Sequence, residues 1–200
     1  MNQVDRSELL PLGEYEIIRE HFRRRIIDEK RHRRVAVGPC MSVVFENHDT
    51  ALLQIQEMLR TERITAEAAI QHELETYNAL VPGPLELKMT LFVEIPEKSE
   101  RERMLVELAG LETSVFVEVD GVRVRAHGEE RDGAEAGRTT AVHYFAVALS
   151  EEQAARVRGR GACLAIAIDH PHYQHRAALS SDVVASLARD FCVTNGASSW

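Results

Sequence analysis

The sequence lacks the features that would place a protein in a membrane or outside the cell. All of its apolar runs are far shorter than the roughly 20 residues that a membrane-spanning helix needs. Residues 1–8 contain no basic stretch followed by an apolar one, as a secretory signal would. These absences predict a cytoplasmic protein that does not associate with a membrane.

Cysteine is scarce, and the common catalytic motifs are missing. The three cysteines, at positions 40, 163 and 192, form no Cys-x-x-Cys pair, which excludes a zinc ribbon or a ferredoxin-type cluster and disfavours a disulfide framework. Cys163 lies in an apolar run, so we expect it to be a small buried residue. No glycine-rich phosphate loop, Gly-x-Ser-x-Gly elbow or His-Glu-x-x-His helix occurs, so nothing indicates nucleotide binding or hydrolysis by an activated nucleophile.

What is present is typical of one globular domain. The chain of 200 residues is 44% hydrophobic and 28% charged, which argues against disorder. We expect an N-terminal segment at 1–13, a single α+β domain at 14–195 and a frayed tail at 196–200. The glycine-rich, mostly acidic stretch 127–138 is expected to be a mobile loop within the domain.

Helices are predicted mainly in the first half of the chain. Residues 14–34 are expected to form a long basic helix, because Ile18, Phe22 and Ile26 recur every four residues. A second helix follows, with Asp49 as its expected N-terminal cap, and a third ends at a Pro-Gly-Pro sequence.

The second half of the chain has the pattern of strands joined by turns. Apolar residues alternate without a break through 85–95, which predicts a strand with one face in the core and the other mostly in water. Asp120-Gly121 is the signal of a type I′ hairpin turn, whose register sets Glu118 opposite Arg123. Because strands follow one another in hairpin order, we predict an α+β fold with a mainly antiparallel sheet, helices packed on it and a long basic N-terminal helix.

Histidines gather shortly after a predicted buried strand. Asp169, His170, His172 and His175 fall within seven residues of one another. Neutral imidazoles and a carboxylate suit iron or zinc, so Asp169, His170 and His172 are candidate metal ligands, and His143 is a further one. The alternative is a polar loop whose histidines hydrogen-bond to the backbone or to solvent.

The net charge of −8 is unevenly distributed along the chain. Residues 14–34 carry +3, so the remainder carries −11. The candidate partner-binding residues all lie in this basic segment and are Arg23, Arg24, Arg25, Lys30, Arg31, Arg33 and Arg34. They have the chemistry to contact an acidic protein surface or nucleic-acid phosphates, but the interleaved acidic residues favour a solvated helix face.

Several segments together resemble an uncharacterised bacterial family, a domain of unknown function. The shared segments are FRRRII at 22–27, KRHRRV at 30–35, FENHDT at 45–50, QIQEMLR at 54–60, ER at 62–63, YN at 77–78, PG at 82–83, TLFVEI at 90–95 and IDHPHY at 168–173. Members of this family are often encoded near rubrerythrin-like proteins and iron–sulfur oxidoreductases. The resemblance therefore implies an accessory role in cytoplasmic non-haem-iron or peroxide-stress redox chemistry. Within and after the segment IDHPHY, the family's recurring positions include Asp169, His170 and Tyr173 but not His172 or His175, which shifts weight within the metal site to His170.

The sequence leaves three functions open. The first is a non-catalytic protein partner in a redox system, which could also form homo-oligomers. The second is a metal-binding protein or metal-dependent enzyme that holds iron or zinc with Asp169 and His170, assisted by His143 or His172. The third is a nucleic-acid-binding regulator that uses residues 23–34, which the acidity of the whole chain disfavours.

Overall fold

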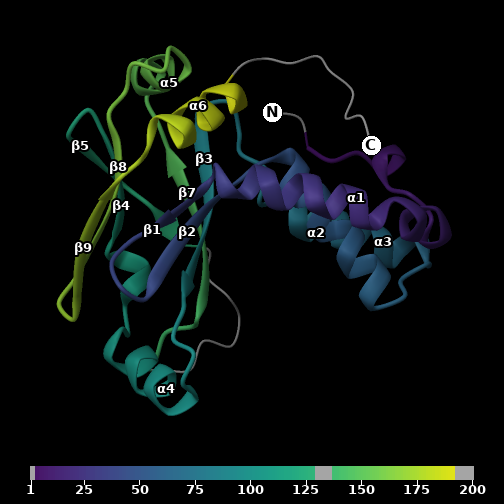
Figure 1. The fold of residues 1–200 in the computed structure, drawn as a ribbon, viewed down its shortest axis with the longest axis horizontal. Coiled ribbons are helices and arrows are strands. Elements are labelled where there is room, and N and C mark those ends of the chain that lie inside the picture. The colour runs from purple at the N-terminus through teal and green to yellow at the C-terminus, as the bar shows by residue number, and fades with distance from the viewer. Residues whose placement is uncertain (1–2, 129–136, 192–200) are drawn as a thin grey trace.

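The computed structural model describes residues 3–128 and 137–191. These residues form two antiparallel sheets, with a three-helix arm beside them, on the right in Figure 1. The fold is α+β, as predicted, although the strands divide between two sheets. The expected tail at 196–200 and most of the expected loop, at 129–136, lie outside the described residues.

Sheet A contains five strands in the order β1-β2-β3-β7-β6. The strands are β1 (Arg34–Ala36), β2 (Met41–Glu46), β3 (Glu86–Val93), β6 (His127–Gly128) and β7 (Val142–Ala148). The alternation predicted for β3 is confirmed, because Leu87, Met89 and Leu91 all belong to the core. The opposite face is drier than we expected: Thr90 is buried there, and its hydroxyl donates to the Glu46 carboxylate at 2.7 Å.

Sheet B contains four strands in the order β5-β4-β8-β9. The strands are β4 (Val115–Val119), β5 (Val122–Arg125), β8 (Leu164–His170) and β9 (Tyr173–Ala178). The β4–β5 hairpin has the predicted register, with Glu118 opposite Arg123. Asp120 and Gly121 have φ values of 50° and 84°, as a type I′ turn requires.

The main core fills the space between the two sheets. Val117 and Ile166 of sheet B lie in one cluster with Met89 and Phe145 of sheet A, and each is at most 1% exposed. Burying a side chain of this size stabilises a fold by about 1.5–3 kcal/mol. The packed faces therefore hold the two sheets together.

The turn between β1 and β2 rests on the last hairpin of sheet B. Gly38 has a φ of 74°, and a Cβ at this position would lie 2.5 Å from the Tyr173 hydroxyl and 2.6 Å from the His175 ring. The Tyr173 hydroxyl donates to the Val37 carbonyl at 2.7 Å and accepts from the Cys40 amide at 3.3 Å. Only glycine fits this contact without displacing the two rings.

Three shorter helices close the edges of the main core. They are α4 (Lys98–Glu107), α5 (Glu151–Arg158) and α6 (Ser181–Asp190), and the 3₁₀ turn η2 (Leu111–Thr113) follows α4. These three helices contribute Leu105, Val157 and Leu187 to the core, respectively. The prediction of a buried Cys163 is wrong: it is exposed, because β8 begins only at Leu164.

The arm has a hydrophobic cluster of its own. It is built from η1 (Arg6–Glu8), α1 (Leu12–Arg31), α2 (His48–Thr61) and α3 (Glu67–Asn78). Tyr15, Phe22 and Ile26 of α1 are at most 1% exposed in this cluster. The helix predicted to run to Arg34 ends at Arg31, because Arg34 already belongs to β1.

Among the described residues, no helix combines the length and the apolar character that crossing a membrane requires.

The cap of α2 is Asn47 rather than the predicted Asp49. The Asn47 side chain accepts from the Thr50 amide at 2.9 Å, and the Thr50 hydroxyl accepts from the Asn47 amide at 2.9 Å. Asp49, already inside the helix, contacts His48 at 3.0 Å and Arg25 at 3.1 Å. Its hydrogen bond raises the pKa of His48 above the ordinary value, against the effect of burial.

Candidate functional site

Helix α1 carries most of the predicted partner-binding residues, and one of its faces is fixed to α2. The Tyr15 hydroxyl donates to Glu57 at 2.6 Å, and Arg19 forms two bonds with the same carboxylate at 2.7 and 2.8 Å. Burial alone would raise the pKa of Glu57, but these hydrogen bonds hold it below its ordinary value. Burial and the Glu57 carboxylate both raise the pKa of Tyr15. The polar contacts and the apolar packing therefore fix which face of α1 meets solvent.

The opposite face of α1 is a stripe of exposed residues that runs along the helix. This α1 stripe consists of Gly13, Ile17, Glu20, Arg24, Ile27 and Arg31. The residues are spaced alternately by four and three, which is the 3.5-residue repeat of a helix face that packs on another helix. Ile17 is 83% exposed and Ile27 is 47% exposed. The stripe thus presents two large apolar side chains to solvent on a helix whose other face is already packed.

The two arginines of the stripe form ion pairs that are easily exchanged. Arg24 lies 2.8 Å from Glu20, and Arg31 lies 2.8 Å from Asp28. The arginine side chains are 68% and 72% exposed, and such pairs contribute only about 0–1 kcal/mol. A carboxylate on another molecule could therefore replace either internal partner at little cost. Lys30, also predicted to bind a partner, is half-buried and lies off the stripe.

Three other arginines of the predicted set point to carboxylates within the chain. Arg23 lies 3.9 Å from Glu57, and Arg25 lies 3.1 Å from Asp49. Arg34 belongs to β1 of sheet A, and it pairs at 2.7 Å with the glutamate that directly follows β3. The structure therefore divides the predicted basic cluster among several surfaces.

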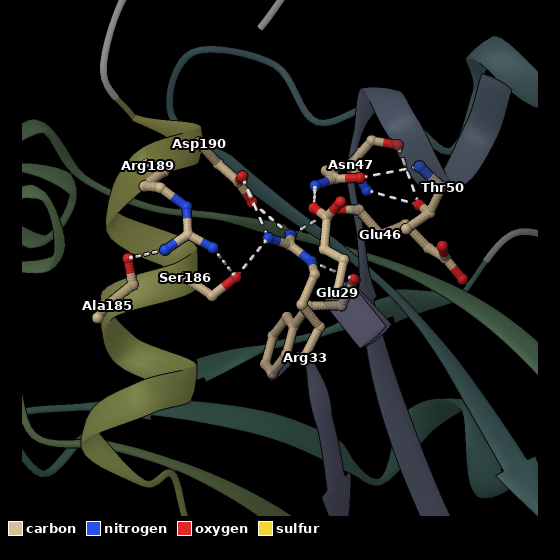
Figure 2. A network of polar contacts seen from close by, with 10 residues as sticks. Glu29, Arg33, Glu46, Asn47, Thr50, Ala185, Ser186, Arg189 and Asp190 are labelled. Carbon is tan, nitrogen blue, oxygen red and sulfur yellow. Dashed lines mark hydrogen bonds and ion pairs between the residues drawn. The ribbon is translucent and has the colours of Figure 1, made fainter. Parts of the chain in front are cut away.

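Arg33 does not lie on the surface, so its position gives no support to the prediction that it contacts a partner. Its side chain is buried between β2 and α6, as Figure 2 shows, because the chain turns inward after α1 to begin β1. The guanidinium donates to the carbonyls of Phe45 at 2.8 Å and Glu46 at 3.0 Å, and to the Ser186 hydroxyl at 3.2 Å. It also forms an ion pair with Asp190. Arg33 therefore joins the arm, sheet A and α6 from inside.

The residues around this ion pair extend the same connection. Asn47, the cap of α2, donates to Glu29 of α1 beside the guanidinium of Arg33 (Figure 2). Burial raises the pKa of Asp190, and the adjacent Arg33 acts in the opposite direction. All contacts of this network are made within the chain, and they give Arg33 a role in holding the fold together.

The predicted metal ligands at the end of β8 have other partners. Asp169 accepts a hydrogen bond from Arg123 at 3.0 Å. His170 is buried, with Nε2 lying 3.1 Å from the Ala109 carbonyl and Nδ1 accepting from the His172 amide at 3.2 Å. These contacts fit a neutral imidazole with its proton on Nε2. Both ring nitrogens of His170 are thus engaged in holding backbone.

The other two candidate ligands do not complete a metal site with His170. The ring of exposed His172 lies 5.8 Å from the His170 ring. His143 belongs to β7 of the other sheet, where its Nε2 contacts the Thr139 hydroxyl at 3.0 Å and its ring stacks on Phe145. Within the described ranges, no three His, Cys, Asp or Glu side chains form a group that could hold a metal ion. Metal binding at Asp169, His170, His172 and His143 stays a prediction, and ligation by His170 would first require breaking one of its hydrogen bonds.

A second feature of the arm was not predicted from the sequence. Residues 4–10, part of the expected N-terminal segment, are packed on the helices through the buried side chains of Val4 and Leu9. The available signal was the spacing of Asp5 and Glu8, which form a capping box around η1.

Comparisons with known proteins agree with the fold and leave the function open. A family model described as "Protein of unknown function (DUF3501)" matches residues 3–191. No curated protein matches the chain. A crystal structure of a novel protein of unknown function from Burkholderia pseudomallei K96243 is 37% identical, with a TM-score of 0.89. The match covers 96% of this chain and 100% of that one.

Proposed function

The chain belongs to the DUF3501 family of proteins of unknown function, and we propose that it is a non-catalytic accessory protein that docks on a partner with the α1 stripe. The observation that carries this proposal is the 83% exposure of Ile17 on a helix whose opposite face is packed. Large apolar side chains held in solvent on a rigid helix are typical of protein contact surfaces.

The composition of the stripe defines the chemistry of the partner. Ile17 and Ile27 require an apolar hollow or another helix, while Arg24 and Arg31 require carboxylates beside it. The partner surface therefore presents apolar groups to the two isoleucines and carboxylates between and beside them. Exposed rim charges of this kind chiefly increase the rate of association, and salt weakens their effect.

We place this partner in a cytoplasmic redox system of the non-haem-iron or peroxide-stress type. The support is the resemblance of the chain to a family whose members are often encoded near rubrerythrin-like proteins and iron–sulfur oxidoreductases. In this role the chain itself supplies no catalytic group, and it positions or regulates the redox protein that it binds.

Surface plasmon resonance between the purified full chain and a purified rubrerythrin-like protein tests the proposal. Replacing Ile17 by aspartate should weaken binding by about tenfold or more, because a central apolar contact typically contributes 1–2 kcal/mol or more. The matched control is Val122→Asp, which changes a valine 60% exposed on β5 of sheet B and should leave affinity unchanged. Binding that both variants weaken equally, or an absence of binding, would contradict the proposal.

A second variant separates charge from apolar contact. Arg24→Glu should slow association and remove part of the salt dependence, with a smaller effect on dissociation. Sedimentation velocity of the chain alone tests whether a second copy of the chain, and not a redox protein, binds the stripe. A dimer dissociated by Ile17→Asp would show that the stripe binds a second copy of this chain, and the redox partner would be rejected.

A further inference from the structure

The residues that precede α1 lie along the helices of the arm. We call residues 4–10 the strap. Val4 and Leu9 are 4% and 5% exposed and belong to the arm's hydrophobic cluster. Between them, Asp5 and Glu8 close η1 through reciprocal hydrogen bonds. The strap therefore has a defined conformation as well as a defined position.

Two side-chain carboxamides hold the strap by its main chain. Asn78, at the end of α3, accepts from the Val4 amide at 2.8 Å and donates to the Val4 carbonyl at 3.0 Å. Gln56 of α2 accepts from the Leu10 amide at 3.0 Å and donates to the Leu10 carbonyl at 2.9 Å. Each carboxamide thus binds both main-chain groups of one residue, as a neighbouring β-strand would. Recognition of this kind is independent of the side chain at the bound position.

The burial of Gln56 indicates that the groove between α2 and α3 suits a main chain. Gln56 is 0% exposed, so its carboxamide would be costly without the two hydrogen bonds that the strap provides. The strap does not fill the groove completely. An apolar hollow of about 220 Å³ remains beside it, lined in part by Leu9, Leu59, Ile64 and Ile70.

Two charged contacts add selectivity for the side chains of the strap. Arg6 forms a two-pronged ion pair with Glu67 of α3, at 2.8 and 3.0 Å. Glu8 lies 3.2 Å from Nε2 of His48 at the start of α2. Together with the two buried apolar anchors, these contacts define a ligand pattern of apolar residue, arginine, glutamate and apolar residue.

We propose that the groove between α2 and α3 is a peptide-binding site, and that the strap of a second copy of this chain binds it in trans. Pro11, which follows the strap and caps α1, is extended, with φ −53° and ψ 147°. A main-chain rotation there lets two copies exchange straps while every contact described above is kept. The tethered strap has an effective concentration of about millimolar, so exchange needs a concentrated protein or a weakened cis strap.

The first test uses the full chain and a fluorescein-labelled peptide of residues 3–12. The unmodified chain should bind the peptide weakly, because its own strap occupies the groove. A Val4→Asp chain, whose strap has lost a buried anchor, should bind about tenfold more tightly by fluorescence anisotropy. If both chains are folded by circular dichroism and bind with equal affinity, the proposal is overturned.

The second test reverses one ion pair and does not depend on a buried substitution. A Glu67→Arg chain repels its own Arg6, so it should prefer a peptide carrying Arg6→Glu over the unmodified peptide by about threefold or more. The control is Glu62→Arg, at an exposed position just after α2, which should show no such preference. A Glu67→Arg chain that does not distinguish the two peptides overturns the proposal. Both tests are independent of the α1 stripe, so their failure leaves the proposed function intact.

Discussion

Replacing Arg33 by methionine should lower the free energy of unfolding by about 3–5 kcal/mol, the usual effect of removing one partner from a buried ion pair. The magnitude follows from what remains in the variant. The side chain of Asp190 is only 6% exposed, so its charge would stay buried without the cation that it pairs with. The carbonyls of Phe45 and Glu46 would also lose the guanidinium as their donor. This effect is already included in the loss of about 3–5 kcal/mol.

Urea unfolding followed by circular dichroism measures this effect, and the chain provides a matched control. Arg31 lies two residues earlier and also forms an ion pair, but its side chain is 72% exposed. Arg31→Met should therefore change the free energy of unfolding by no more than about 1 kcal/mol. A loss of less than 1 kcal/mol for Arg33→Met, or equal losses for both variants, would refute the assignment of Arg33 as an internal link.

Two further measurements identify the unpaired carboxylate as the cause. Replacing Asp190 by leucine in the Arg33→Met background should recover part of the lost stability, because no buried charge remains. In the single variant, burial raises the pKa of Asp190 and the largest opposing effect, that of Arg33, is gone, so the native state binds a proton more readily than the unfolded state. The destabilisation by Arg33→Met should therefore shrink as the pH falls into the acid range, and a constant loss would contradict the explanation.

Single contacts determine the expected outcome of three other substitutions. Gly38→Ala should lower the free energy of unfolding by about 2–4 kcal/mol, because the added methyl group meets the rings of two side chains. The control Gly110→Ala, at φ 89° with open space around it, should cost only about 1 kcal/mol of backbone strain. Urea unfolding compares the two variants. The raised pKa of His48 means that its protonated form stabilises the fold at low pH, and this contribution is lost as the pH rises through that pKa. Unfolding curves recorded between about pH 5.5 and 8.5 should therefore show a pH-dependent stability that His48→Gln removes. The control His72→Gln, at an exposed position, should retain this pH dependence. His170→Ala should lower the free energy of unfolding by about 2–3 kcal/mol, because two backbone groups lose their hydrogen-bond partner. A chelator should leave the melting temperature of the unmodified chain unchanged. Near-stoichiometric iron or zinc by elemental analysis, lost in the variant, would instead support the metal site.

The parts of the fold that the sequence predicted correctly are those decided by local physics. The β4–β5 hairpin depends on two adjacent residues that accept positive φ, and Asp120-Gly121 supplies them. Strand β3 depends on an alternation that only an extended chain can place on one face of a sheet. Strand β9 was missed because Gln174, His175 and Arg176 show no such alternation, and it becomes a strand through its pairing with β8.

The candidate site was predictable only in part, for a related reason. Composition identified the basic residues near α1, but the distinction between a surface arginine and an internal one depends on distant partners. The buried Arg33 forms its ion pair with Asp190, which lies 157 positions away in the sequence. The strap was missed for the same reason, since Asn78 binds Val4 across 74 positions and Gln56 binds Leu10 across 46. Pairings of this range leave no periodic signal in the sequence.

The isoleucines of helix α1 differ widely in exposure, and this difference underlies the proposed function. These isoleucines fall into two sets, and the 3.6-residue period lets only one set face the arm's core. Ile26 is completely buried there, while Ile17 remains 83% exposed on the other side of the helix. Burying such a side chain contributes about 1.5–3 kcal/mol, which the isolated chain does not gain at Ile17. A partner that covers the stripe would gain it, so binding there is favoured by the same effect that packs the opposite face of the helix.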